Sequence, residues 1–348
     1  MENLPLGVTA ALIGLIGGIV LGLAGRLGNF CTLGALEHAV FGSDQKRLRM
    51  WGIVLGTAII GTWGLAGSGL VALDRTFYHA IAWNPLASIV GGLVFGYGMA
   101  LAGNCGYGAL VRFGGGDLRS LVVVVVLAIS GYVAMSGPLA PLRVALFPQP
   151  EATAPQGIVS SVQMLVLLPP LAIATAIGLG FIAWALAHAP LRAAPGQIAW
   201  AVAAGAAVVF CLAGTTWLDE ASLGAVGVEG PSFTAPLGRT LLYLMTSTAG
   251  GITFSVGCVL GVGVGAFIGS LLRGRFRWEA CEDPRELGRQ MGGAALMGVG
   301  GVVAMGCSIG QGVTGFATLA WSGPVTLAAI AVGAVVGLRV LIGGFQQG

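Results

Sequence analysis

Residues 93–108 read LVFGYGMALAGNCGYG and residues 296–310 read LMGVGGVVAMGCSIG, and the two stretches share one glycine pattern. Counted from Cys105 and from Cys307, glycines stand nine and seven residues before the cysteine and three residues after it. Residues 22–34, GLAGRLGNFCTLG, form a weaker copy around Cys31, which keeps the first and last of these glycines. Each stretch is an apolar run that ends in a glycine-rich break. The repeat therefore predicts helices that are interrupted at a cysteine and followed by a short second piece.

The composition indicates a membrane protein. Of the 348 residues, 56% are hydrophobic and 8% are charged, whereas a soluble protein carries about 25% charged residues. The 61 glycines follow no three-residue period, so the chain is not collagen-like. In lipid, glycine lets helix backbones approach closely. We predict an all-α polytopic membrane protein, with residues 1–348 forming one integral membrane domain and no soluble catalytic domain.

Nine stretches are long and apolar enough to cross a bilayer, which requires about 20 residues. They are residues 6–26, 50–72, 85–103, 118–139, 164–187, 197–214, 249–272, 290–306 and 323–345. The pieces after the three break cysteines and a helix near 238–247 are too short to span, and we predict them to be re-entrant or interfacial. The first stretch lacks the positive flank of a signal peptide, so we expect it to be retained.

The loop charges orient these spans, because Lys and Arg favour cytoplasmic loops. Counting nine spans from an outside N-terminus places every basic loop in the cytoplasm, the acidic loops outside and the C-terminus inside. The basic loops hold Lys46, Arg47, Arg49, Arg112, Arg119, Arg192, Arg273, Arg275, Arg277, Arg285 and Arg289. The acidic loops hold Asp74 with Arg75, and Asp219, Glu220 and Glu229 with Arg239.

Under this topology the chain approaches Cys105 from outside and Cys307 from inside. Two related halves of opposite orientation are typical of inverted-repeat transporters, whose sites lie at broken helices near the bilayer midplane. We predict a pseudo-symmetric inverted repeat, with a first half over residues 1–139 and a second half over 248–348. Residues 140–247 would supply intervening helices and, over 140–163, an outside loop that joins the halves.

The candidate site residues gather at the breaks, where unpaired N–H groups and the positive end of a helix dipole suit an anion. We predict a functional role for Cys31, Cys105 and Cys307. A cysteine within a continuous membrane helix is usually packing filler; this is our interpretation of Cys211, while Cys258 stays open between the two roles. Cys281, in a charged loop, is expected to be a bystander. The polar residues near the breaks are Asn29, Asn104, Ser308, Gln311 and Thr314.

The chemistry of such a path follows from residues that the sequence lacks. It has only three histidines and no acid in the centre of a predicted span, which argues against a metal site and a carboxylate proton relay. No cysteines have the Cys-x-x-Cys spacing of thiol redox enzymes. We expect no enzyme activity, cofactor, metal or nucleic-acid partner. Neutral thiols and amides are weak donors, which suit a polarizable sulfur-containing anion better than a strongly hydrated one.

The three cysteine stretches, together with GVGVGAFIGSLLRGRFRWEA at residues 261–280, resemble the YeeE/YedE-type family of sulfur-compound transporters. The resemblance covers roughly residues 6–120 and 250–345. It implies an hourglass-shaped helical fold in a bacterial inner membrane, with a narrow central path along which thiosulfate meets cysteines in turn. Residue by residue, it assigns this role to Cys31, Cys105 and Cys307. It also implies a small cytoplasmic TusA-like sulfur carrier as a partner, for which the loop over residues 273–290 is the expected dock.

Three functions remain open on the sequence. The first is an inner-membrane transporter for thiosulfate or a related small sulfur anion. The second is a membrane thiol protein for sulfur transfer or redox chemistry. The third is a channel for a selenium compound, another small solute or a soft metal ion.

Overall fold

The computed structural model describes residues 5–42, 44–153, 156–248, 250–280 and 283–345. These residues form helices joined by short loops, and β-structure among them is limited to isolated bridges. Seven helical segments of the described chain are long and apolar enough to cross a membrane. The predicted fold class is therefore confirmed: the chain is an all-helical, multi-pass membrane protein.

A helix occupies each of the nine predicted spans. These helices are α1 (Leu6–Leu27), α3 (Lys46–Gly67), α5 (Pro85–Ala102), α7 (Leu118–Met135), α10 (Pro170–Leu186), α12 (Pro195–Ala221), α14 (Phe254–Leu272), α15 (Pro284–Val303) and α16 (Ser322–Phe345). By length and composition, α10 is too short to count among the seven segments. The first turns of α15 carry Arg285, Glu286 and Arg289, which lower its hydropathy. The count of nine membrane crossings therefore stays a prediction.

Short helical pieces follow the three breaks, as predicted. They are α2 (Thr32–Val40), α6 (Gly106–Phe113) and a π-helix, η1 (Gly310–Gly315). The predicted short helix near 238–247 is α13 (Ala235–Thr246). Two further one-turn helices, α4 (Phe77–Ala80) and α11 (Ala189–Arg192), lie in connections.

Two sequence-based boundaries are wrong. Residues 140–163, predicted to be a loop, contain α8 (Ala140–Leu146) and α9 (Ile158–Gln163). The span predicted to start at residue 164 starts only at Pro170. Proline lacks an N–H and fits the first turn of a helix, so Pro169 and Pro170 set the start of α10 and Pro141 sits in the first turn of α8.

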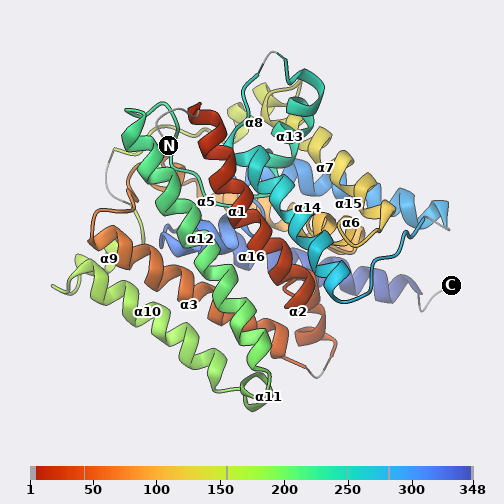
Figure 1. Cartoon of the computed structure of the whole chain (residues 1–348), viewed down its shortest axis with the longest axis horizontal. Coiled ribbons are helices and arrows are strands. Elements are labelled where there is room, and N and C mark those ends of the chain that lie inside the picture. Colours follow the sequence, from red (N-terminus) through yellow and green to blue (C-terminus); the bar gives the residue numbers. More distant parts are fainter. Residues whose placement is uncertain (1–4, 43, 154–155, 249, 281–282, 346–348) are drawn as a thin grey trace.

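Glycines bring α1 and α14 into backbone contact. A Cβ added at Gly18 would lie 2.3 Å from the carbonyl oxygen of Cys258, and one added at Gly261 would lie 2.3 Å from the carbonyl oxygen of Leu15. The two helices run parallel, and each carries glycines at four-residue intervals on this face. Such spacing lets membrane helices pack at short range. Figure 1 shows α1 between α14 and α12, both of which it contacts.

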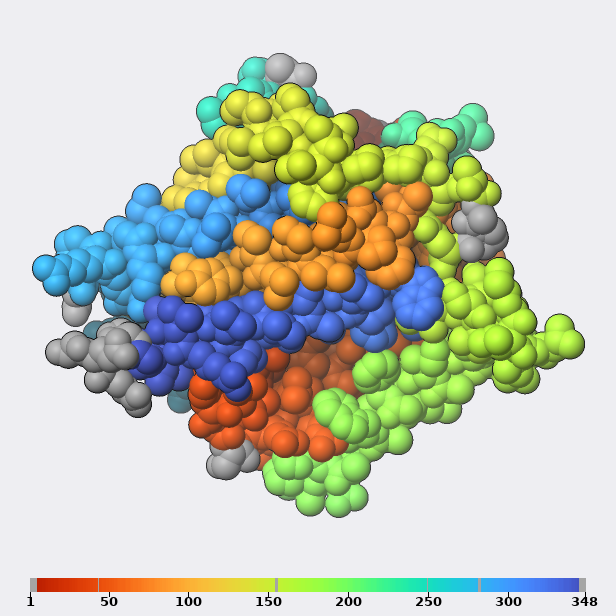
Figure 2. All heavy atoms as spheres, turned by 180° about the vertical axis from the view of Figure 1, so that it is seen from behind, coloured from red at the N-terminus to blue at the C-terminus, as the bar shows by residue number. Residues whose placement is uncertain are grey.

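The helices α5 and α15 cross through a reciprocal set of glycines. A Cβ added at Gly91 would lie 2.7 Å from the carbonyl oxygen of Gly300, and one added at Gly98 would lie 2.5 Å from that of Gly293. Gly91 and Gly293 stand 14 residues before their break cysteines, and Gly98 and Gly300 stand seven before them. These exchanged positions are what a two-fold axis between the helices would produce. They support the predicted inverted repeat, which itself stays a prediction. Figure 2 shows α5, in orange, between the blue helices α15 and α16.

Candidate functional site

The three cysteine breaks share a backbone conformation. Two residues before each cysteine, the chain turns through a left-handed residue: Asn29 with φ 56°, Gly103 with φ 75° and Met305 with φ 58°. Non-glycine residues rarely adopt this conformation, so strain at Asn29 and Met305 is built into the site. After the turn, Cys31 and Cys105 occupy the N-cap positions of α2 and α6. The breaks predicted from the glycine pattern are therefore present at all three cysteines.

The glycine three residues after a break cysteine has a specific contact at two of the breaks. The N–H of Gly108 donates to Sγ of Cys105 at 3.4 Å, and the N–H of Gly310 donates to Sγ of Cys307 at 3.3 Å. The amide groups that we expected to be unpaired are thus bonded to the thiols. Each sulfur accepts this bond with a lone pair, so the bond itself does not use the S–H of the thiol.

A loop between α12 and α13 also reaches Cys307. The N–H of Phe233 donates to Sγ of Cys307 at 3.2 Å, and the hydroxyl of Ser232 lies 4.0 Å from the same atom. Phe233 packs on Tyr107, with ring centroids 5.4 Å apart, so the loop closes over the residues that follow Cys105. Cys307 is 1% exposed and Cys105 is fully buried.

The breaks meet one another inside the protein. The hydroxyl of Thr32, next to Cys31, donates to the hydroxyl of Ser308 at 3.0 Å. A Cβ added at Gly108 would lie 3.7 Å from Sγ of Cys105 and 3.9 Å from Sγ of Cys31, so these two sulfurs flank one glycine. The fold therefore gathers the three cysteine segments into one cluster.

The other predicted site residues differ in burial and in their distance from the cysteine cluster. Asn104 and Gln311 are 2% and 1% exposed, and the side-chain oxygen of each has no hydrogen-bond partner among the described residues. The amide nitrogen of Gln311 donates to the carbonyl of Ala304 at 3.1 Å, inside the third break. Asn29 is exposed. Cys258 is buried within α14 where this helix contacts Gly14 and Gly18 of α1, and it lines neither cavity described next.

Two polar cavities open near the cluster. The first, which we call the arginine vestibule, has a volume of about 250 Å³ and includes Asn29, Cys31 and Gly108 in its lining. Its basic residues are Arg26, Arg47, Arg112, Arg273 and Arg275. The second, the mixed-charge vestibule, has a volume of about 340 Å³ and reaches Ser232, Met305 and Gly306 beside Cys307. Its charged residues are Arg143, Glu229 and Arg239.

The two vestibules lie at opposite ends of the long helices. Ser255, near the start of α14, lines the mixed-charge vestibule, and Arg273, directly after its end, lines the arginine vestibule. A helix of 19 residues is about 28 Å long. The buried thiols of Cys105 and Cys307 lie in the cluster between these two mouths. This arrangement fits the predicted hourglass, although a continuous path stays a prediction.

The grouping of charges agrees with the predicted sides of the membrane. Arg47, Arg112 and Arg273 come from three different loops or helix ends that were predicted to share a side, and they line one cavity. Two loops predicted for the other side are joined by an ion pair of 2.8 Å between Arg75 and Asp219. The hydrogen bond to Asp219 raises the pKa of Arg75 above its ordinary value.

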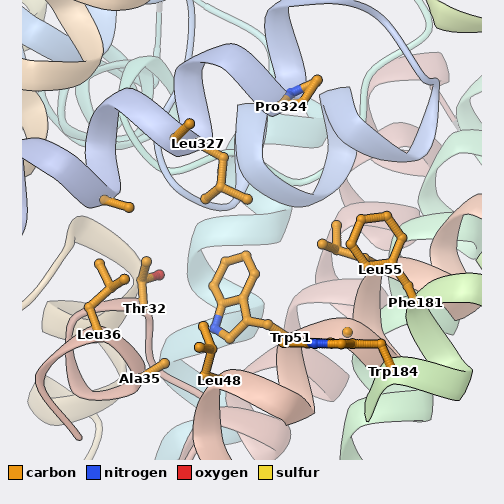
Figure 3. A pocket seen from close by; sticks show the side chains of 13 residues that line it. Thr32, Ala35, Leu36, Leu48, Trp51, Leu55, Phe181, Trp184, Pro324 and Leu327 are labelled. Carbon is orange, nitrogen blue, oxygen red and sulfur yellow. The ribbon is translucent and has the colours of Figure 1, made fainter. Parts of the chain in front are cut away.

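A third cavity, of about 280 Å³, is apolar and is unsuited to an anion. Figure 3 shows Trp51, Leu55, Phe181 and Leu327 around it, with the hydroxyl of Thr32 at one edge. An anion moved here would lose its hydration and gain almost no hydrogen bonds in return. The polar vestibules are therefore the better candidates for the ends of a substrate path.

Sequence reasoning missed two groups of site residues. Arg47, Arg112, Arg273 and Arg275 were used only to orient loops. Arg26, which stands five residues before Cys31 at the end of an apolar run, was a usable signal that was not used. Ser232 and Phe233 gave no local signal, because their contact with Cys307 spans 74 or more residues.

Comparisons with known proteins place the chain among sulfur transporters. Residues 27–336 match the model of the sulphur transport family (Sulf_transp). Over 335 residues the chain is 28% identical to the thiosulfate transporter TsuA of Escherichia coli (strain K12), with 92% of each chain covered. Over 324 residues it is 24% identical to the thiosulfate transporter TsuA of Spirochaeta thermophila, with 90% of this chain and 92% of that one covered.

Proposed function

The chain belongs to the sulphur transport family, and from this premise we propose that it takes up thiosulfate across a bacterial inner membrane. It is a transporter rather than an enzyme. Both TsuA relatives are aligned along nearly their whole length, which supports the same substrate here. In the proposed orientation the N-terminus is outside, the C-terminus is cytoplasmic and the arginine vestibule opens to the cytoplasm.

The observation that carries the proposal is the cysteine cluster between two polar vestibules. Thiosulfate enters the mixed-charge vestibule, passes Cys307 and Cys105, and reaches Cys31 at the arginine vestibule. At the first two positions a backbone N–H already occupies the sulfur as acceptor, which leaves the S–H to donate to the anion. Hydrogen bonds to a charged acceptor are stronger than neutral ones, so a dianion gains from each thiol in turn.

The polar neighbours of the thiols complete this path. Asn104, Ser308 and Gln311 are buried beside the cysteines and supply amide and hydroxyl groups. Asn29 faces the arginine vestibule, where the anion leaves. Cys258 remains a candidate, because its burial against α1 also fits a packing role.

The test is uptake of labelled thiosulfate by the purified chain in liposomes, with and without a membrane potential. Cys105→Ala and Cys307→Ala each remove a charge-assisted hydrogen bond and should lower uptake by about tenfold or more. Cys211→Ala is the matched control, since Cys211 is an equally buried thiol in α12. Cys258→Ala tests the remaining candidate. Normal uptake by both break variants would refute the cysteine path.

Further measurements separate this proposal from its rivals. Thiosulfate, but not sulfate or copper, should compete from the side of the mixed-charge vestibule; competition by copper, or by a selenium compound instead of thiosulfate, would favour a channel for another solute. A persulfide or mixed disulfide on Cys105 during turnover, detected by mass spectrometry, would favour a thiol protein for sulfur transfer.

We also propose a small TusA-like sulfur carrier as the cytoplasmic partner, docked on residues 273–280 and 283–290. These residues include Arg273 and Arg275 of the arginine vestibule and further arginines such as Arg277, Arg285 and Arg289. A purified carrier of this type should float with liposomes that contain the chain. Arg285→Glu with Arg289→Glu should weaken this binding, and unchanged binding would rule out this dock.

A further inference from the structure

The arginine vestibule contains far more positive than negative charge. Its lining includes five guanidinium groups from α1, α3, α6 and the segment after α14, and one carboxylate, that of Glu37. The guanidinium groups belong to Arg26, Arg47, Arg112, Arg273 and Arg275. Like charges that share a cavity of about 250 Å³ repel one another. An anion between them would relieve this repulsion.

The described residues supply little negative charge to balance these arginines. Within the described residues, none of the five takes part in an ion pair with a carboxylate. Two of them instead bind neutral backbone groups: Arg26 donates to the carbonyl of Arg275 at 3.3 Å, and Arg273 donates to the carbonyl of Leu27. Carbonyl contacts hold a guanidinium in place and leave its charge uncompensated. Arg112 and Arg275 are exposed at this mouth.

We propose that the arginine vestibule is a binding site for a divalent sulfur oxyanion, which it holds by the sulfonate oxygens. The site would serve the thiosulfate that leaves the thiols, and in this respect the inference rests on the proposed function. Guanidinium groups match the oxygens of sulfur and phosphorus oxyanions and respond to their charge. They make no use of the terminal sulfur, which is the atom that sets thiosulfate apart from sulfate.

Selectivity is therefore divided between two places. The thiols of the cluster distinguish the polarizable sulfur, whereas the vestibule accepts any small dianion with the same three oxygens. Sulfate consequently binds in the vestibule although it is not carried through the cluster. Sulfate on this side occupies the exit and slows the release of thiosulfate.

Cys31 provides a reporter for this site. Its thiol is partly exposed and lines the arginine vestibule, whereas Cys105, Cys211, Cys258 and Cys307 are buried. A cavity lined by charges of one sign raises the local concentration of the opposite ion by about tenfold or more. A small anionic thiol reagent should thus reach Cys31 faster than a cationic reagent of the same size.

The experiment uses the purified full chain in lipid nanodiscs. Its probes are a sulfonate-bearing and a trimethylammonium-bearing methanethiosulfonate, with modification of Cys31 followed by mass spectrometry of its peptide. We expect the anionic reagent to react about tenfold faster. Sulfate should slow it several-fold, whereas sodium chloride of equal ionic strength should slow it much less. Arg112→Gln with Arg275→Gln should remove the preference and the protection by sulfate.

Two controls make the result specific. Arg192→Gln removes an exposed arginine of α11, outside the vestibule lining, and should behave like the unmodified chain. Arg112→Lys with Arg275→Lys keeps both charges, so it should retain the preference for the anionic reagent and lose most of the sulfate protection. If the double glutamine variant does not fold, the single Arg275→Gln variant should lower the preference by severalfold.

Equal rates for the two reagents, or equal protection by sulfate and chloride, would overturn the inference. Neither readout depends on uptake. A chain that shows sulfate protection but no thiosulfate uptake would refute the proposed function and keep the oxyanion site. A chain that takes up thiosulfate but shows no protection of Cys31 by sulfate would refute the oxyanion site and keep the proposed function.

Discussion

The hydroxyl of Thr32 donates a 3.0 Å hydrogen bond to the hydroxyl of Ser308, across 276 residues of sequence. Both side chains are buried, at 4% and 0% exposure, and each directly follows a break cysteine. The bond therefore ties the first break to the third.

We expect Thr32→Val to destabilise the protein, because it leaves the buried Ser308 hydroxyl without this donor. Loss of one partner of a buried hydrogen bond costs about 1–3 kcal/mol. Thermal unfolding in detergent measures the effect for Thr32→Val, Ser308→Ala and the double variant. The double variant should be more stable than the two single losses predict when added. Strict additivity would show that the hydroxyls do not interact.

The contact between α1 and α14 depends on the absence of a side chain at Gly261. We expect Gly261→Ala to lower the unfolding temperature, because the new methyl carbon would lie 2.3 Å from the carbonyl oxygen of Leu15 and 3.0 Å from the Cα of Gly18. Overpacking of this kind costs about 1–3 kcal/mol. Gly263→Ala, in the same helix, is the control: nothing lies within 4 Å of its added Cβ. It should be neutral or slightly stabilising, since alanine favours helix. Similar losses for both would refute the close contact.

The left-handed turns at the breaks predict that glycine is tolerated there and that alanine or valine destabilises the protein. Gly103 has φ 75° and open space around its added Cβ, so Gly103→Ala tests the backbone alone and should cost about 1 kcal/mol. Asn29 has φ 56° and is exposed, so Asn29→Gly should leave the unfolding temperature nearly unchanged, with Asn29→Val clearly lower. Equal stability of the glycine and valine variants would contradict the turn.

The breaks could be predicted from sequence because their determinants are local. The glycine three residues after Cys105 or Cys307 donates its N–H to the cysteine sulfur. The apolar run before each cysteine predicts the helix that ends at the break. The fold class could be predicted from composition, because a chain with so few charged residues requires a lipid environment. The start of α10 at Pro170 was missed because residues 164–168 are also apolar, and hydropathy does not register that Pro169 and Pro170 lack N–H groups.

Apart from Arg26, the remaining site residues could not be predicted, because they depend on tertiary contacts. Ser232 and Phe233 lie in the segment between α12 and α13, which carries no cysteine motif, and only the fold brings them to Cys307. Arg47, Arg112, Arg273 and Arg275 were predicted to share one side of the membrane, but loop charge gives a side of the membrane and not a shared cavity.

The glycine-lined contact between α1 and α14 also affects how the chain is made. Gly18 and Gly261 are separated by more than 240 residues, so at the usual pace of synthesis α1 waits roughly 10 to 50 s in the membrane for its partner. The same delay applies to α5, whose partners α15 and α16 are synthesised last. The glycine faces of α1 and α5 therefore have no partner helix until α14, α15 and α16 are inserted. Since the third cysteine also arrives with these last helices, the proposed path past the three thiols cannot be complete in an unfinished chain.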